Sequence, residues 1–184
     1  MDLKPLDIIL IEAGSTMRWI DPMAWIIHQR TSSWLTHGVI VLNSKGRIVE
    51  ATGGGVHYAD ISKYSERKCI QLRYDREFTR QQRLQMLLWA EDKANRKCKY
   101  EFKSFLGYLT GIETNYLDDP DQFVCVEFCA EMFTQNGIEI WGCERPTYIY
   151  PKHFAMNGCF RKVNKNELVK EISNRNGYQE SWRA

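Results

Sequence analysis

Short apolar runs separated by turn residues mark the first half of the chain. Asp7–Ile11 is one such run, and the proline and glycine that bound it are typical of a buried strand. Thr36–Leu42 and Arg47–Ala51 flank the turn residues Asn43–Gly46, so this region predicts a two-stranded hairpin. The apolar runs therefore indicate a sheet.

Helix signals alternate with these strands. Asp21 and Pro22 supply a cap residue and a proline at the first helical position, so a helix is expected through about Arg30. Thr79 opens a second segment, in which apolar side chains fall on one helical face: Leu84, Leu87, Leu88 and Ala94. We expect this face to lie in the core.

A third helix carries the cysteine of greatest interest. The run Asp118–Asp121 announces this helix and Asn136–Gly137 ends it. Apolar residues recur between them at four-residue spacing: Val124, Phe128 and Met132. Strand-like Thr147–Tyr150 follows. Because helices and strands mix without a regular βαβ alternation, the sequence favours an α+β fold.

Length and composition suit one compact domain. The chain has 184 residues, of which 43% are hydrophobic and 26% charged, and we expect a domain over residues 1–161 followed by a charged tail over 162–184. A net charge of +2, with acidic and basic residues interleaved, argues against a nucleic-acid partner. No apolar run approaches the ~18 residues of a membrane span, and Met1–Pro5 lacks the start of an export signal. A cytoplasmic product without an integral membrane segment is expected.

Cys125 stands in the first turns of the predicted third helix, where backbone N–H groups and the helix dipole favour a thiolate. The acidic residues just upstream oppose this effect, so a nearby imidazolium is needed. The alternative is that Cys125 is a small buried apolar residue, the commonest fate of a cysteine. The six cysteines are expected to be reduced thiols rather than a disulfide framework: Cys69, Cys98, Cys125, Cys129, Cys143 and Cys159.

The predicted hairpin brings a histidine and a glutamate together. Closure of the turn pairs Val39 with Glu50, which makes His37 and Glu50 diagonal neighbours on one face with Cβ atoms about 7 Å apart. A carboxylate at that distance can orient an imidazole, as the acid and base of a nucleophilic triad do. The alternatives are a solvated Glu50 and a strand-end His37 without a chemical role.

Other candidate sites have less support. His28, His57 and His153 are interpreted as surface residues. A zinc site would draw on Cys125, Cys129, Cys143, His153 or Cys159, but these form no CxxC pair, so no metal and no cofactor is expected. Gly53–Gly55 lacks the Gly-Lys-Ser/Thr ending of a phosphate loop and is interpreted as a flexible corner.

Three segments in this order carry a family resemblance: Thr36-His37-Gly38-Val39, Ile48-Val49-Glu50-Ala51 and Cys125-Val126-Glu127-Phe128. The chain resembles the circularly permuted branch of the NlpC-type papain-like hydrolases, over roughly residues 6–154. The resemblance implies a papain-like antiparallel sheet packed against helices, with Cys125 as nucleophile, His37 as base and Glu50 as its orienting acid. Val126 departs from the serine usual after the nucleophile.

A second cysteine keeps the position of the nucleophile open. Cys129-Ala130-Glu131 repeats the Cys-x-Glu pattern one turn later, which makes Cys129 the alternative nucleophile.

The resemblance implies a cysteine peptidase or amidase that hydrolyses an amide or ester bond. Its substrate would be a peptidoglycan crosslink, another peptide or a lipid-type ester. The alternative is a structural or binding component of a larger assembly such as a phage particle, with protein partners and a dormant site. Such a chain would be virion-associated or released by lysis.

Overall fold

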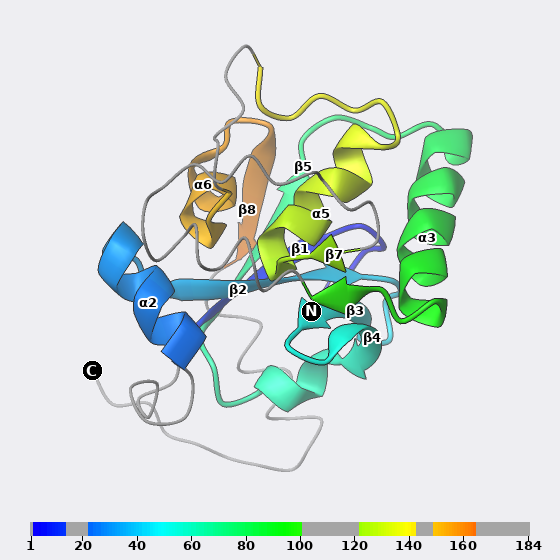
Figure 1. Ribbon diagram of the computed structural model, residues 1–184. Helices are drawn as coiled ribbons and strands as arrows, with labels where there is room; N and C mark the ends of the chain where they lie inside the picture. The colour runs from blue at the N-terminus through cyan, green and yellow to red at the C-terminus, as the bar shows by residue number, and fades with distance from the viewer. Residues whose placement is uncertain (1, 14–21, 101–121, 143–148, 165–184) are drawn as a thin grey trace.

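A six-stranded antiparallel sheet forms the centre of the structure. The computed structural model describes residues 2–13, 22–100, 122–142 and 149–164 (Figure 1). The strand order is β4-β3-β2-β1-β5-β8. The strands are β1 (Ile8–Glu12), β2 (Leu35–Val41), β3 (Arg47–Thr52), β4 (Gly55–Asp60), β5 (Cys69–Tyr74) and β8 (Phe160–Asn164). The α+β class expected from the sequence is confirmed.

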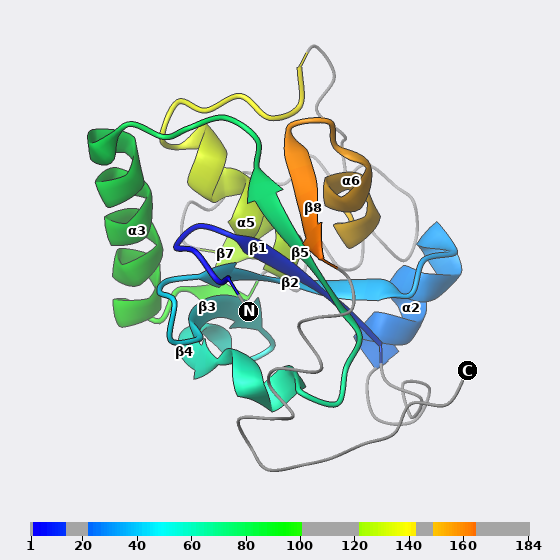
Figure 2. The same cartoon turned by 180° about the vertical axis from the view of Figure 1, so that it is seen from behind.

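Helices pack around this sheet. They are α2 (Pro22–Thr31), the 3-10 helix η1 (Ile61–Tyr64), α3 (Arg80–Asn95), α5 (Cys125–Thr134) and α6 (Pro151–Met156), while β6 (Lys99–Tyr100) and β7 (Gln122–Phe123) form a separate parallel pair. Figure 1 shows α5 in front of β1 and β2, and Figure 2 shows the same strands from behind, in front of α5. Among the described residues no helix has the length and apolarity needed to cross a membrane.

The hairpin between β2 and β3 has the predicted register. Ile40 lies opposite Val49, which is the alignment that makes His37 and Glu50 diagonal neighbours. The predicted register is therefore confirmed, and His37 and Glu50 lie beyond the last paired residues of this ladder.

The glycine run after β3 forms a tight turn into β4, so the predicted corner after the strand of Glu50 is present. β4 begins at Gly55, whose φ of +94° favours glycine. A Cβ at this position would lie 2.6 Å from the carbonyl oxygen of Cys98, so the backbone approaches closely here. The turn lays β4 on β3 and places His57 directly opposite Glu50.

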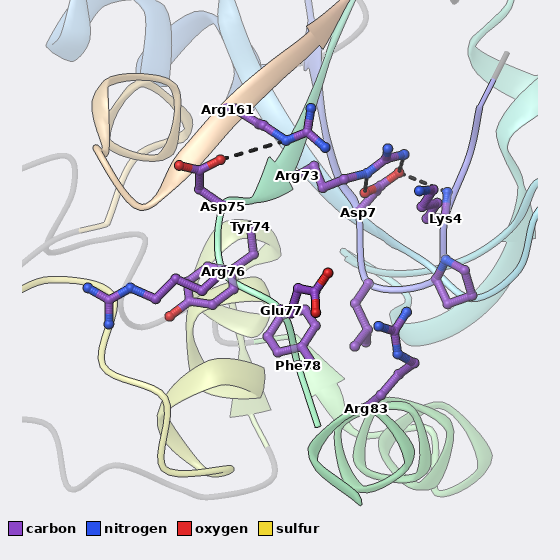
Figure 3. A pocket seen from close by; sticks show the side chains of 12 residues that line it. Lys4, Asp7, Arg73, Tyr74, Asp75, Arg76, Glu77, Phe78, Arg83 and Arg161 are labelled. Carbon is purple, nitrogen blue, oxygen red and sulfur yellow. Dashed lines mark hydrogen bonds and ion pairs between the residues drawn. The ribbon is translucent and has the colours of Figure 1, made fainter. Parts of the chain in front are cut away.

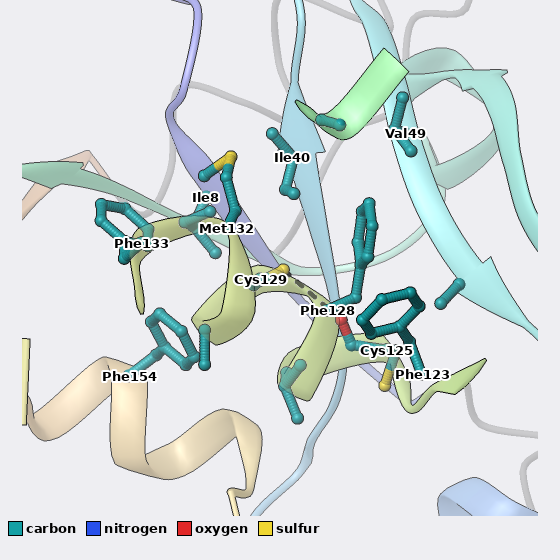
Figure 4. Close-up of a cluster of buried hydrophobic side chains, with 14 of the residues drawn as sticks. Ile8, Ile40, Val49, Phe123, Cys125, Phe128, Cys129, Met132, Phe133 and Phe154 are labelled. Atoms are coloured by element: carbon teal, nitrogen blue, oxygen red, sulfur yellow. Dashed lines mark hydrogen bonds between the residues drawn. The ribbon is translucent and has the colours of Figure 1, made fainter. Parts of the chain in front are cut away.

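The sheet separates two groups of buried side chains. Alternate residues of β1 point to opposite faces, with Ile8 and Leu10 in the larger core and Ile9 and Ile11 in the smaller one. The larger core contains the apolar side chains of α5 (Figure 4). The smaller core includes Ile61 of η1.

Helix α3 buries a different face from the predicted one. Its fully buried residues are Met86, Ala90 and Ala94. Leu84 and Leu88 are 57% and 55% exposed, so the prediction for these two is wrong, whereas Ala94 is buried and Leu87 packs partly against the core. Residues two positions apart on a helix point about 200° apart, which is why burial of Met86 turns Leu84 and Leu88 outward.

The end of the domain lies beyond the predicted boundary at residue 161. Lys162 belongs to β8, which pairs with β5, so the described domain continues to Asn164. Ile149 and Tyr150 are not in a strand, since Tyr150 is the N-cap of α6. The helix that carries Cys125 begins at Cys125, shortly after β7, so the predicted start at 118–121 is wrong. Residues 165–184 of the predicted tail and residues 147–148 lie outside the described residues.

Candidate active site

His37 and Glu50 contact each other at the end of the β2–β3 hairpin. Nε2 of His37 lies 2.8 Å from Oε2 of Glu50. The ionised carboxylate accepts hydrogen bonds, so the imidazole donates through Nε2. The other ring nitrogen, Nδ1, is left for another partner.

Cys125 lies beside the same imidazole. It is the first residue of α5, and its side chain hydrogen-bonds to the side chain of His37. Val124 is the N-cap residue of α5, and its side chain makes no hydrogen bond to the N–H groups of the first turn. Figure 4 shows the thiol of Cys125 at the start of the helix. The structure thus brings together the three residues that the sequence singled out.

Close packing at Gly38 brings α5 against β2. A Cβ at Gly38 would lie 2.7 Å from Cγ1 of Val126, closer than two carbon atoms normally approach. Gly38 directly follows His37, and Val126 directly follows Cys125. We therefore expect the close approach at Gly38 to help set the spacing between the imidazole and the thiol.

The charges of this group support one another. Burial alone would lower the pKa of His37, but the charge and hydrogen bond of Cys125, together with Glu50, raise it to about 9. Burial alone would raise the pKa of Glu50, but His37 first, and then Lys63 and Tyr64, lower it to about 2. At neutral pH this environment favours a protonated imidazole at His37 beside an ionised carboxylate at Glu50.

Cys129 has a different environment from Cys125. It is fully buried, and its Sγ donates to the carbonyl oxygen of Cys125 at 3.5 Å. Burial, followed by the charge of Cys125, raises the pKa of its thiol well above the usual range. The structure places Cys125, rather than Cys129, beside His37.

Sequence reasoning missed the other partners of Glu50. The ammonium of Lys63 donates to Oε1 and the hydroxyl of Tyr64 donates to Oε2. His57, expected at the surface, is half-buried in β4 with its Nε2 3.3 Å from Oε1 of Glu50. A tight hairpin turn at the glycine run would have been the signal for His57, because it aligns that residue with Glu50. No periodic pattern announces Lys63 or Tyr64.

The other histidines serve local structure. Nδ1 of His28 lies 3.1 Å from the carbonyl oxygen of Ser33, and its ring stacks on the exposed Trp34. His153 lies in α6, where Nδ1 accepts from the N–H of Tyr150. Among the residues described, no group of three or more His, Cys, Asp or Glu side chains could hold a metal ion. Cys143, one of the zinc candidates, lies outside them.

A cleft lies at the far end of β1 from this site (Figure 3). Asp7 lines it at the start of the strand, whereas His37 pairs with Ile11 near the other end. Nε of Arg73 lies 2.8 Å from Oδ1 of Asp7. The cleft is therefore lined in part by arginine that is already paired with a carboxylate.

The comparisons with known proteins show the fold alone. No family model matches the chain, and no curated protein sequence matches it. Among solved structures, the chain is similar to metalloprotein yiiX from Escherichia coli O157:H7, a DUF1105 protein, with a TM-score of 0.61 and 15% identity. The match covers 90% of this chain and 99% of that chain.

Proposed function

We propose that the chain is a cysteine hydrolase of the papain-like, NlpC-type kind, which cleaves an amide or ester bond with Cys125, His37 and Glu50. The observation that carries this proposal is the position of His37. Its Nε2 is held by the buried carboxylate of Glu50 at 2.8 Å, and its side chain also hydrogen-bonds to Cys125. A nucleophile, a base and an orienting acid in this order are the requirements of acyl transfer.

The proposed reaction has two steps. The thiolate of Cys125 attacks the substrate carbonyl, and the proton on Nδ1 of His37 passes to the leaving amine or alcohol as its bond to carbon breaks. The N–H groups at the start of α5 stabilise the negative charge on the carbonyl oxygen. Water then attacks the thioester carbonyl and gives its proton to His37. The bond between carbon and sulfur breaks, the acid product leaves, and the thiolate of Cys125 and the protonated His37 are restored.

Thiol labelling tests the assignment of the nucleophile. Iodoacetamide at pH 7 should alkylate Cys125 of the native protein faster than its other cysteines, and Cys125→Ala should lose this fast labelling. Cys129→Ala is the matched control, because it removes a thiol of the same helix, and it should label as the native protein does. His37→Gln should slow labelling by about 10²-fold, since the thiol loses its imidazolium. Equal labelling of native protein and His37→Gln contradicts the proposal.

The substrate is tested separately from the nucleophile. We propose a peptide crosslink of peptidoglycan, with other peptides and lipid-type esters as the competing classes. Purified peptidoglycan and a panel of peptides and esters are incubated with native protein and with Cys125→Ala. Product release that requires Cys125 identifies the class, and release that is equal in both proteins rejects it.

One observation favours the alternative of a binding or structural component with a dormant site. Cys125 is only 3% exposed, and a substrate carbonyl must reach the sulfur. A dormant site predicts slow alkylation that is the same with and without His37. The labelling experiment therefore separates the two functions.

A further inference from the structure

Glu50 is shared by four hydrogen-bond donors or cations, which matches the acceptor capacity of a carboxylate. His37 and Tyr64 approach Oε2, while Lys63 and His57 approach Oε1. The carboxylate is fully buried, so these side chains rather than bulk water balance its charge. How strongly Glu50 holds the proton of His37 therefore depends on the other three.

The short helix η1 holds Lys63 and Tyr64 at the two oxygens. Asp60 caps η1 with its side chain, and Ile61 is buried and donates its N–H to the carbonyl of Gly46 at 2.9 Å. The end of Lys63 is thus directed to the carboxylate although its side chain is 42% exposed. An exchange of this side chain opens no cavity in the core.

We propose that Lys63 is a positioning residue. By binding the carboxylate that also binds the imidazole, it weakens the stabilisation of protonated His37 by Glu50. This role rests on the proposed function, because the proton matters only if His37 serves Cys125. The ammonium neutralises part of the carboxylate charge. Without Lys63, Glu50 stabilises the imidazolium more strongly, and His37 gives its proton to the leaving group less readily.

The titratable groups that face the Glu50–His37 pair come from β4, η1 and α5. They are His57 on β4, Lys63 and Tyr64 on η1 and Cys125 on α5, with Arg67 acting on Tyr64. Burial and then Glu50 raise the pKa of Tyr64, so its hydroxyl remains a neutral donor. Lys63 differs from Tyr64 in bringing a full positive charge to the carboxylate.

Proton NMR titration of the full chain tests this role. The imidazole signal of His37 is identified by its absence in His37→Gln, and its midpoint is compared between native protein and Lys63→Met. We expect the midpoint to rise on the order of one pH unit in Lys63→Met. A repeat of the comparison in Cys125→Ala removes the influence of the thiol and isolates the Glu50–His37 pair.

Two control variants separate the effect of the Lys63 charge at Glu50 from the effect of changing any lysine. Lys63→Arg keeps the charge and should titrate close to the native protein. Lys68→Met removes the same charge from an exposed lysine nearby in sequence and should leave the midpoint unchanged. If Lys63 only held Glu50 in place, its loss would free His37 and lower the midpoint. A lower or unchanged midpoint in Lys63→Met overturns the proposal.

The NMR result is independent of catalysis, so its failure differs from failure of the proposed function. Alkylation that does not depend on His37 rejects the hydrolase, whatever the midpoint does. If the alkylation supports the hydrolase but the midpoint does not rise, only the role of Lys63 is rejected. In the active protein, Lys63→Met should move the pH profile of kcat to higher pH and lower kcat at pH 7 by about tenfold.

Discussion

Gly38→Ala tests whether close packing of α5 on β2 sets the distance between Cys125 and His37. The added Cβ would lie 2.7 Å from Cγ1 of Val126, whereas carbon atoms in contact are normally about 3.5–4.0 Å apart. The overlap is therefore about 1 Å. Val126 is buried and β-branched, with one strongly preferred rotamer in a helix, so we expect α5 to move rather than the side chain.

The expected effects on stability and on chemistry are both measurable. Overpacking of this kind costs about 1–3 kcal/mol of unfolding free energy. A displacement of about 1 Å between reacting groups lowers a rate by up to about 10²-fold. We expect Gly38→Ala to unfold at a lower urea concentration and to react with iodoacetamide at Cys125 about 10- to 10²-fold more slowly.

A double-mutant cycle separates this overlap from a general loss of stability. Val126→Ala removes the methyl group that the new Cβ meets, so the double variant should alkylate faster than Gly38→Ala alone. Urea unfolding and alkylation rates are measured for all four proteins. Two results would refute the idea that this contact positions the thiol. One is an alkylation rate in Gly38→Ala equal to that of the native protein, and the other is a double variant that alkylates no faster than Gly38→Ala.

The remaining predictions concern stability, measured by urea unfolding. Glu50, whose pKa is about 2 instead of 4.5, stabilises the fold above pH 4.5, and this contribution is lost as the pH falls from about 4.5 to 2. His37, whose pKa is about 9 instead of 6.5, stabilises fully below pH 6.5 and loses its contribution as the pH rises towards 9. Each loss should be on the order of 3 kcal/mol, and a flat profile in the native protein contradicts both. Thr79→Ala should lower the free energy of unfolding by about 1 kcal/mol, because the Thr79 hydroxyl accepts a hydrogen bond from a first-turn N–H of α3 at 3.1 Å. A variant as stable as the native protein would show that this cap contributes nothing. Gly55→Ala should cost at least about 2 kcal/mol, because φ is +94° and the Cβ would lie 2.6 Å from a backbone oxygen, and a smaller cost would show that the turn adapts.

Local patterns were sufficient to predict the hairpin that carries His37 and Glu50. Turn residues set the register of β2 and β3, and the two-residue period of strands then decides which side chains share a face. The contact of His37 with Glu50 followed from these two rules. The approach of Cys125 did not, because it depends on how α5 packs on β2 at Gly38, and the sequence supplied it only through a resemblance.

Contacts that depend on neighbouring elements were not predictable in this way. His57 reaches Glu50 because β4 folds directly back on β3, and Lys63 and Tyr64 arrive from a single turn of η1. In α3 the predicted apolar face was only partly right, because Leu84 and Leu88 are exposed while Ala94 is buried. The structure buries Met86, Ala90 and Ala94, because the choice of face is made by the surfaces that α3 meets.

The environment of Glu50 bears on the choice between an enzyme and a binding component. A fully buried carboxylate needs charged and hydrogen-bonding partners, and replacing such a network with apolar residues of similar volume is often neutral or stabilising. Stability alone therefore gives little reason for His37, His57, Lys63 and Tyr64 to converge on one carboxylate. Perturbed titratable groups concentrate at functional sites, where their charge state serves chemistry. This argument favours a working site, and Glu50→Gln tests it. The variant leaves His37 and Lys63 without their buried counter-charge, so it should unfold at a lower urea concentration at pH 7, and its Cys125 alkylation should also fall. Alkylation as fast as in the native protein would contradict the argument.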